Sequence, residues 1–477
     1  MADATTRTRP LVAITVLASC GLLVSLVQTM VVPLLPEFPR LMAVSPSTAS
    51  WLITANLIAG AVSAPVLGRL GDMYGKRRML LVALALVGVG SLLGAIAPNI
   101  VVLLVARALQ GAAFGVIALG MSLMRDVLPP DRVGSGVGLM SASLGFGAAI
   151  GLPVTGVVAQ FANWRWLFVG AAVIAVVQIL LVRRLVPESS LHGSGRFDAV
   201  GAVGISAALV CLLLAISKGN EWGWTSPLVL GLLAAAVLLV LAFARYQLRV
   251  RYPLVDLRVS ARPAVLWTNI ASVLVGFAMF TGFVLATQIL QAPEATGYGH
   301  GLSLIVAGLA LLPMGASMVV FASVSATLSR LRGPRTTLML GTLVLGVGNL
   351  GFAMLPTTLG LLIAVSVCTA IGAALAYSAI PLLIMRAVPE SETAAANSLN
   401  TLMRQLGTSS CTAVATAVTT ASVIDLDGQI LPSGFAYSTA FVAAGCAGLV
   451  ALVVVALTPA PSASDALETA ADLAAAR

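Results

Sequence analysis

Two arginines lie deep inside long apolar segments, where a charged side chain needs a polar partner. Arg107 lies about 10 Å along its segment and Arg404 about 14 Å along another, at the 1.5 Å rise per residue of an α-helix. Ionisable groups at such depth are costly in a membrane and commonly line substrate or ion pathways. Each arginine also has a structural interpretation: Arg107 can reach the membrane surface or a backbone carbonyl, and Arg404 can bind backbone between helices. Both are therefore candidates for binding charge, with these alternatives left open.

Polar and aromatic residues share several helix faces. Asn397, Asn400 and Arg404 follow i, i+3, i+7 spacing and form one polar stripe, which must face a cavity or another helix rather than lipid. Aromatic rings with a few amides suit a large, partly apolar ligand, although packing or lipid contact also explains the phenylalanines. The further candidate cavity residues lie on two more faces and at two isolated positions: Ser25, Gln28 and Thr29; Phe277, Thr281 and Gln288; Asn56 and Tyr377.

Residues 68–78, after the second apolar segment, combine glycines with one acid and a run of bases. Gly68 and Gly75 permit a tight turn and a close approach of helices. Asp72 can accept hydrogen bonds from a helix N-terminus or a neighbouring arginine, which would make a latch that breaks when two halves of the protein rock. We assign Lys76 and Arg77 to the same latch. An ordinary basic turn is the alternative.

The composition requires a membrane protein around these residues. Of the 477 residues, 59% are hydrophobic and only 9% are charged, and the mean hydropathy is +1.04. So few charges cannot cover a water-soluble surface, which excludes a soluble enzyme. Five scattered cysteines and two histidines leave little material for a metal site or for Ser-His-Asp catalysis. We therefore expect no metal, no cofactor and no enzymatic activity.

Apolar segments of about 20 residues, the length that crosses a bilayer, recur along the whole chain. We predict an all-α polytopic membrane protein with fourteen transmembrane helices. They begin near Leu11, Thr48, Met79, Ile100, Val133, Trp166, Ala199, Leu228, Ala264, Leu302, Thr337, Leu359, Ala395 and Ala436. With the N-terminus inside, only Arg40, Arg165 and Lys218 among the 26 Lys and Arg residues fall in external loops. The positive-inside rule therefore predicts that both termini are cytoplasmic, and it explains the net charge of +9 without nucleic acid.

An internal repeat divides the chain. Residues 124–127, a proline turn and a small-residue helix resemble residues 385–388 and the helix that follows them. Two related halves are the usual construction of a secondary transporter. We predict a six-helix half at residues 1–186, two inserted helices with their loops at 187–262, a second six-helix half at 263–458 and a cytoplasmic tail at 459–477.

The pattern of residues 68–78 resembles the signature loop of the major facilitator superfamily, G-x-L-x-D-x-x-G-R/K-R/K. The run Arg107-Ala108-Leu109-Gln110-Gly111 is similar to the R-x-x-Q-G element of that family, so the resemblance marks Gln110 beside Arg107 for proton or ion coupling. With fourteen predicted spans, the chain resembles most the drug:proton antiporters. The glycine spacing of the antiporter motif is matched, with the proline one residue beyond its usual place, by Gly138, Gly147, Gly151, Pro153 and Gly156. The resemblance implies a major-facilitator fold, with these residues as moving parts.

One position departs from that family. Its members commonly carry an aspartate in the first helix that takes part in proton coupling, and this chain has Val27 there. We place no acidic residue at mid-membrane depth. Glu37 and Glu294, at the external ends, are the remaining candidates for proton coupling together with Asp72.

The resemblance implies a secondary-active exporter of drugs or amphipathic metabolites in a bacterial cell membrane. Proton-coupled antiport by alternating access is the expected mechanism, and one chain with both halves can act as a monomer. The alternative is an exporter of organic anions or metabolites, or a facilitator without obligatory proton exchange.

Overall fold

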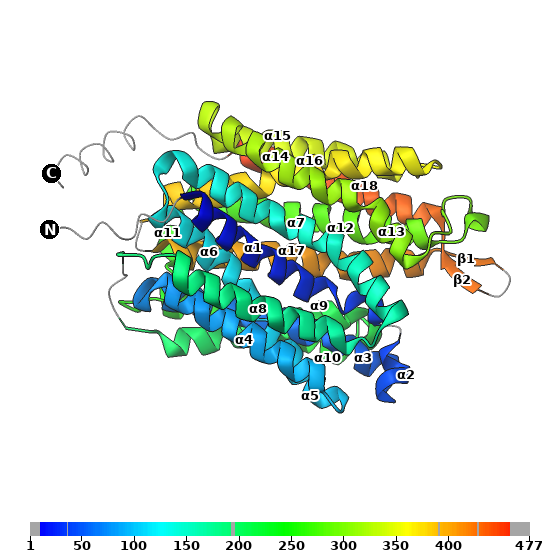
Figure 1. The fold of residues 1–477 in the computed structure, drawn as a ribbon, viewed down its shortest axis with the longest axis horizontal. Coiled ribbons are helices and arrows are strands. Elements are labelled where there is room, and N and C mark those ends of the chain that lie inside the picture. The colour runs from blue at the N-terminus through cyan, green and yellow to red at the C-terminus, as the bar shows by residue number, and fades with distance from the viewer. Residues whose placement is uncertain (1–9, 36, 192–195, 390–391, 427–428, 458–477) are drawn as a thin grey trace.

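The computed structural model describes residues 10–35, 37–191, 196–389, 392–426 and 429–457, which form a bundle of long helices and one β-hairpin (Figure 1). The helices run along the long axis of the molecule. We call the end where α1 (Pro10–Thr29) begins and α18 (Gly434–Ala456) stops the termini end. The opposite end carries the hairpin of β1 (Val423–Leu426) and β2 (Gln429–Pro432), and we call it the hairpin end.

The remaining elements follow in chain order. The first part of the chain forms η1 (Val32–Leu34), α2 (Phe38–Met42), α3 (Pro46–Tyr74), α4 (Lys76–Ile96), α5 (Ile100–Gln110), α6 (Ala113–Val127), α7 (Pro130–Phe161) and α8 (Arg165–Leu185). The rest forms α9 (Ala199–Trp222), α10 (Pro227–Gln247), α11 (Leu257–Ser260), α12 (Pro263–Gln291), η2 (Glu294–Thr296), α13 (Leu304–Ala310), α14 (Leu312–Leu331), α15 (Pro334–Ala353), α16 (Leu359–Ala387) and α17 (Thr393–Ala421).

Local signals explain where the helices begin. Proline is the first residue of α1, α3, α7, α10, α12 and α15, a position where its missing N–H breaks no intrahelical bond. The side chains of Ser45, Ser226 and Ser433 accept a hydrogen bond from the backbone N–H three residues onward and so cap α3, α10 and α18. A helix begins close to every start that the apolar segments predicted.

Thirteen helical segments in the described part of the chain are long and apolar enough to cross a membrane, so this is a multi-pass membrane protein. They do not include α17, which has 29 residues but is much more polar than the others. α17 packs against α3, α6, α9 and α12, so protein rather than lipid surrounds much of it. The count of fourteen spans and the cytoplasmic placement of the termini stay predictions.

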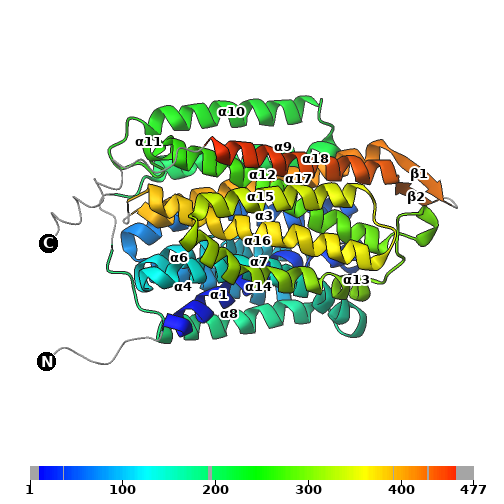
Figure 2. The same cartoon turned by 90° about the horizontal axis from the view of Figure 1, so that it is seen from above.

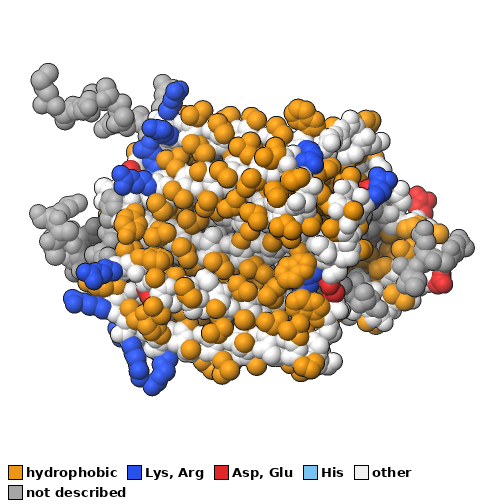
Figure 3. Space-filling view, turned by 90° about the horizontal axis from the view of Figure 1, so that it is seen from below, with side chains coloured by type: hydrophobic (Ala, Val, Ile, Leu, Met, Phe, Trp, Pro, Cys, Tyr) orange, Lys and Arg blue, Asp and Glu red, His pale blue; other side chains and the backbone are white. Residues whose placement is uncertain are grey.

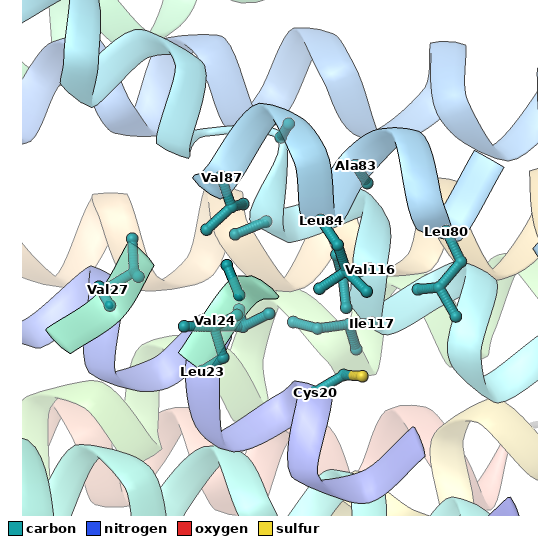
Figure 4. Close-up of a cluster of buried hydrophobic side chains, with 14 of the residues drawn as sticks. Cys20, Leu23, Val24, Val27, Leu80, Ala83, Leu84, Val87, Val116 and Ile117 are labelled. Atoms are coloured by element: carbon teal, nitrogen blue, oxygen red, sulfur yellow. The ribbon is translucent and has the colours of Figure 1, made fainter. Parts of the chain in front are cut away.

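Two apolar cores hold the bundle together. One joins α1, α4, α6 and α8, and the other joins α12, α14, α15, α16 and α18. Figure 4 shows part of the first core, where Val24 and Val27 of α1 lie with Leu84 and Val87 of α4 and with Val116 of α6. α9 and α10 pack on each other, with α9 also touching α3 and α17 and α10 at the edge of the bundle (Figure 2).

The surface that these helices expose is largely apolar (Figure 3). Many of the visible Lys and Arg side chains gather at the termini end, and apolar side chains cover the middle. Such a surface fits a lipid bilayer, where the helices satisfy their own backbone hydrogen bonds.

Candidate functional site

Asp72 lies at the termini end, where α3 meets the beginning of α17. Its carboxylate oxygens accept hydrogen bonds from the backbone N–H groups of Ala394 (3.1 Å) and Ala395 (2.8 Å), and Asp72 is fully buried. The first N–H groups of a helix lack intrahelical partners and form its positive dipole end, so they stabilise a carboxylate. Asp72 therefore makes the expected contact with a helix N-terminus, and that helix lies more than 300 residues further along the chain.

Lys76, the first residue of α4, extends this contact. Its Nζ lies 2.7 Å from Asp126 Oδ2 of α6, 2.8 Å from Thr393 Oγ1 of α17 and 3.7 Å from Asp72 Oδ1. The Lys76 side chain has no exposed surface. We call Asp72, Lys76, Asp126 and residues 393–395 the latch. A buried charge is stable only when it is fully paired, so the latch joins four helices as one cooperative unit.

The glycines of this segment allow the helices to meet. A Cβ at residue 68 would lie 2.8 Å from the carbonyl oxygen of Ala394 and collide with the side chain of Ser398, so Gly68 permits the contact between α3 and α17. Gly75 has φ +109°, a left-handed conformation that favours glycine, and it turns the chain from α3 into α4.

Two acidic residues of this region were not among the predicted site residues. Glu188 accepts hydrogen bonds from the backbone N–H groups of Arg77 (2.8 Å) and Arg78 (3.1 Å), which caps α4. The guanidinium of Arg77 donates to the backbone carbonyl of Arg183 on α8. Asp126, the ion-pair partner of Lys76, directly follows Met124 and Arg125 of the internal repeat. It lies 50 residues from Lys76 in the sequence, so no sequence pattern could predict that the two side chains meet.

Glycines let α7 pack closely on both sides. A Cβ on Gly147 would lie 2.7 Å from Ser25 Cβ of α1, and one on Gly151 would collide with the Thr29 hydroxyl. On the other side, a Cβ on Gly156 would lie 3.0 Å from Ile305 of α13. Pro153 faces α13 as well, where a Cβ on Gly308 would lie 2.7 Å from its Cδ. α7 is therefore a close-packed seam between α1 and the α13–α14 pair.

Arg107 is fully buried and has protein partners for its guanidinium. Its Nε donates to the carbonyl of Leu52 (3.1 Å), and one terminal nitrogen donates to the carbonyl of Val27 (2.8 Å) and to Gln110 Oε1 (2.7 Å). Val27 lies in the last turn of α1, whose carbonyls lack intrahelical donors. Asn56 in turn donates to the carbonyl of Arg107 (3.0 Å). The arginine thus ties α1, α3 and α5 together at the position where the resemblance implied an aspartate.

Of the three predicted cavity residues of α1, Ser25 and Thr29 are buried against α7, whereas Gln28 is only half-buried. Ser25 donates to the carbonyl of Leu144 on α7, and Thr29 donates to the carbonyl of Ser25 (2.9 Å). Both are buried against the α7 glycines. Gln28 is only half-buried, and its amide has no hydrogen-bond partner in the described part of the chain.

Arg404 lies in the middle of α17 and is only 7% exposed. Its guanidinium lies 4.9 Å from the ring centroid of Tyr377 on α16, and within the described residues it makes no hydrogen bond and no ion pair. The amides that share its face bridge to other helices: Asn397 donates to Ser122 of α6 (3.0 Å), and Asn400 donates to Asn269 of α12 (2.9 Å).

The three predicted cavity residues of α12, Phe277, Thr281 and Gln288, differ in how far they are buried. Thr281 is buried and donates to Cys411 Sγ of α17 (3.1 Å), whereas Phe277 is half-buried. Gln288 is exposed and accepts a hydrogen bond from the Tyr437 hydroxyl (3.2 Å). These three residues therefore do not share one environment.

The predicted acidic residues of the hairpin end are accessible. Glu37 makes a 3.4 Å ion pair with Arg40, and the two side chains are 55% and 84% exposed. They line a cavity of about 530 Å³ together with Gly156, Trp164 and Ile305. Glu294 is exposed in η2, in the loop between α12 and α13. Nearby, burial raises the pKa of Tyr298, so its phenol stays protonated.

Residues 17–412 match the family model described as Major Facilitator Superfamily. The chain belongs to this superfamily. It is accordingly a transporter of small molecules and not an enzyme. The solved structure of the human organic anion transporter MFSD10 has the same fold, with a TM-score of 0.65 at 16% identity over 94% of this chain and 99% of that one.

The chain is also similar in sequence to bacterial resistance and transport proteins. The lincomycin resistance protein of Streptomyces lincolnensis is 30% identical over 94% of this chain and 91% of its own length. The MFS-type transporter YhcA of Bacillus subtilis is 27% identical over 70% of this chain. That match spans only 62% of YhcA.

Proposed function

We propose that this transporter exports small amphipathic organic compounds, such as drugs or secondary metabolites, across a bacterial cell membrane. In the proposed cycle it alternates access between two six-helix halves and exchanges substrate for protons, as the fourteen-helix drug:proton antiporters do. The likeness to a lincomycin resistance protein along nearly the whole chain supports this substrate class.

The observation that carries the proposal is the latch. Asp72 and Lys76 join α3 and α4 to the beginning of α17, so the first and the last parts of the chain are fastened to each other at the termini end. At the hairpin end, a cavity of about 530 Å³ lies between residues of α7 and residues 303–305. The termini end also has a cavity of about 530 Å³, but the residues that line it, among them Tyr74, Arg183 and Glu188, all belong to the first part of the chain. The first and last parts are therefore joined at the termini end and separated by a cavity at the hairpin end, which matches one state of an alternating-access cycle.

A second candidate keeps the transport cycle but removes obligatory proton exchange. The acidic residues within the long described helices, Asp72, Asp126, Asp131 and Glu221, lie in the first or last turn of their helices. Val27 presents an apolar side chain to the first core, and its carbonyl is the group that binds Arg107. These features favour an organic-anion or metabolite exporter or a facilitator, and they leave Glu37, Glu294 and Asp72 as the candidate proton carriers.

The experiment that separates the two is uptake of dyes and antibiotics into inside-out vesicles with an imposed pH gradient. Collapse of uptake when the gradient is dissipated supports proton antiport. Uptake that persists without pH gradient and membrane potential supports a facilitator. Vesicles that accumulate none of the compounds above the level of empty-vector vesicles would contradict the export of drugs.

A further inference from the structure

Arg404 is a buried arginine whose guanidinium contacts an aromatic ring and no hydrogen-bond acceptor within the described residues. A guanidinium has five N–H donors and remains charged at all physiological pH values. A cation–π contact with Tyr377 occupies the face of the ring but none of those donors. Arg404 therefore holds a largely buried positive charge and a set of unused donors that are not completely enclosed by protein.

The pair lies at a junction of helices that the transport cycle would move. Ser141 of α7 donates to the backbone carbonyl of Tyr377 (3.1 Å), so α16 is held against α7 at this point. On the other side, a Cβ on Gly276 of α12 would lie 3.3 Å from Arg404 Cγ, so α12 packs against the stem of the arginine. The arginine side chain thus lies between α12, α16 and α17, with its stem packed on α12 and its guanidinium over the Tyr377 ring.

No described acidic residue supplies the missing charge. Asp72, Asp126, Asp131 and Glu221 lie at the ends of their helices, whereas Arg404 is in the middle of α17. Asn397 and Asn400, the other polar groups of this face, donate to α6 and α12. A buried charge without a partner is unfavourable, so the site favours binding of an anion from solution.

We propose, building on the proposed export function, that Arg404 and Tyr377 form an anion-binding subsite of the transport pathway. The guanidinium would bind a carboxylate through two parallel N–H···O hydrogen bonds, the geometry for which arginine is preorganised. The phenol ring adds an apolar face that suits an aromatic substrate. The anion is either the acidic group of an organic substrate or a small inorganic ion such as chloride.

The test compares 2-naphthoate with its uncharged isostere 2-naphthamide on the purified full-length protein. Dissociation constants are obtained from the ligand-dependent rise in Tm, because a ligand that binds only the folded state stabilises it. The variants are Arg404→Gln, Arg404→Lys and, as a matched control on an exposed arginine, Arg330→Gln. Chloride and acetate are titrated alone and in competition with naphthoate.

We expect naphthoate to raise the Tm of the wild type and naphthamide to leave it unchanged. Arg404→Gln should weaken naphthoate binding at least tenfold, Arg404→Lys should weaken it less, and Arg330→Gln should bind as the wild type does. Without ligand, Arg404→Gln should melt at or above the temperature of the wild type, because it removes an unpaired charge. If Arg404 had only a structural role, the Arg404→Gln substitution would lower the Tm instead.

Chloride decides between the two sources of the anion. If chloride alone raises the Tm and competes with naphthoate, the subsite takes an inorganic ion; if only aromatic acids act, it takes the acidic group of a substrate. Equal naphthoate affinity in the wild type and Arg404→Gln would overturn the proposal, as would a wild type that responds to none of these anions. An Arg404→Gln protein that melts well below Arg330→Gln would also overturn it.

The vesicle assay keeps this proposal separate from the export function. Uptake of cationic or neutral dyes by a protein with no anion response would leave export standing and remove the subsite. If anions bind in a way that depends on Arg404 but the protein transports none of the compounds, the anion-binding subsite is supported and the proposed drug export is contradicted.

Discussion

The termini end and the hairpin end differ in the contacts that join the first and the last parts of the chain. At the termini end, Asp72 and Lys76 are fully buried and join α3 and α4 to α17. At the hairpin end, the charged pair beside the cavity, Glu37 and Arg40, is more than half exposed and joins only neighbouring residues of one short segment. The hairpin end also has a buried cation, Lys218, but it joins only α9 to the beginning of α3.

This difference has a physical consequence. An exposed ion pair contributes little because water and salt screen it, whereas breaking a buried pair leaves an unpaired charge in a low-dielectric environment. The latch should therefore behave as an all-or-none contact, and the segment beside the hairpin-end cavity should change shape at low cost. Substitutions in the latch should therefore reduce stability and efflux more than substitutions at the exposed pair of the hairpin end.

The largest effect is expected from Lys76→Met, because it leaves Asp72 and Asp126 buried without their cation. Breaking a buried pair in this way costs about 3–5 kcal/mol, so Tm in detergent and efflux should both fall sharply. Arg78→Met, at an exposed position two residues away, is the matched control. A Lys76→Met protein with the Tm and flux of the wild type would show that the buried charges do not fasten the termini end.

Asp72→Asn should have the next largest effect. The amide still fits but loses the charge that the N-terminus of α17 stabilises, and charged hydrogen bonds contribute about 1.5–3 kcal/mol each. Since about 1.4 kcal/mol is a factor of ten, we expect initial efflux rates to fall about tenfold or more with expression unchanged. The control is Asp131→Asn, whose side chain is 66% exposed; normal flux in Asp72→Asn would remove Asp72 from the mechanism.

Gly68→Ala should weaken the same contact sterically. The added methyl group meets Ser398 and the carbonyl of Ala394, and overpacking of this kind costs about 1–3 kcal/mol. Efflux should fall several-fold. Gly231→Ala on α10 adds the same methyl group where nothing lies within 4 Å, so it should transport normally. Equal flux in the two variants would contradict close packing of α3 on α17.

Arg40→Gln is expected to have the smallest effect. Its side chain is 84% exposed, and its only ion pair within the described residues is with Glu37. Efflux should stay within about twofold of the wild type, because exposed pairs contribute little. A loss as large as that of Asp72→Asn would reverse the comparison between the two ends.

The sequence predicted most of the helical architecture because membrane helices have strong local signals. Apolar segments of about 20 residues predicted helix starts, and a helix begins near each of them. The structure adds the prolines and serine caps that fix where several of these helices begin. The β1–β2 hairpin was missed, since two strands of four residues have too little pattern to stand out. Hydropathy alone does not mark α17 as a membrane-spanning helix although it has 29 residues. Its polar side chains, which bind other helices, lower its mean hydropathy.

The site was predictable only where the chemistry is local. The capacity of Asp72 to accept from a helix N-terminus could be stated from its residue type, but its partner α17 and the role of Asp126 required the fold. Arg107 and Arg404, the two arginines inside long apolar segments, gave the same sequence signal. The structure separates them: Arg107 donates to two backbone carbonyls and to Gln110, whereas the guanidinium of Arg404 has an aromatic ring and no acceptor among the described residues.

The central claim is that opening the latch at the termini end accompanies closure at the hairpin end. Spin-label distances test it in a protein whose native cysteines are replaced by alanine. One labelled pair replaces the exposed Tyr74 and Leu331 at the termini end, and the other replaces the exposed Leu41 and Val306 at the hairpin end. We predict that Asp72→Asn adds longer distances to the first pair and shorter distances to the second. Distance distributions that are the same in Asp72→Asn and in the protein with Asp72 intact would contradict the account.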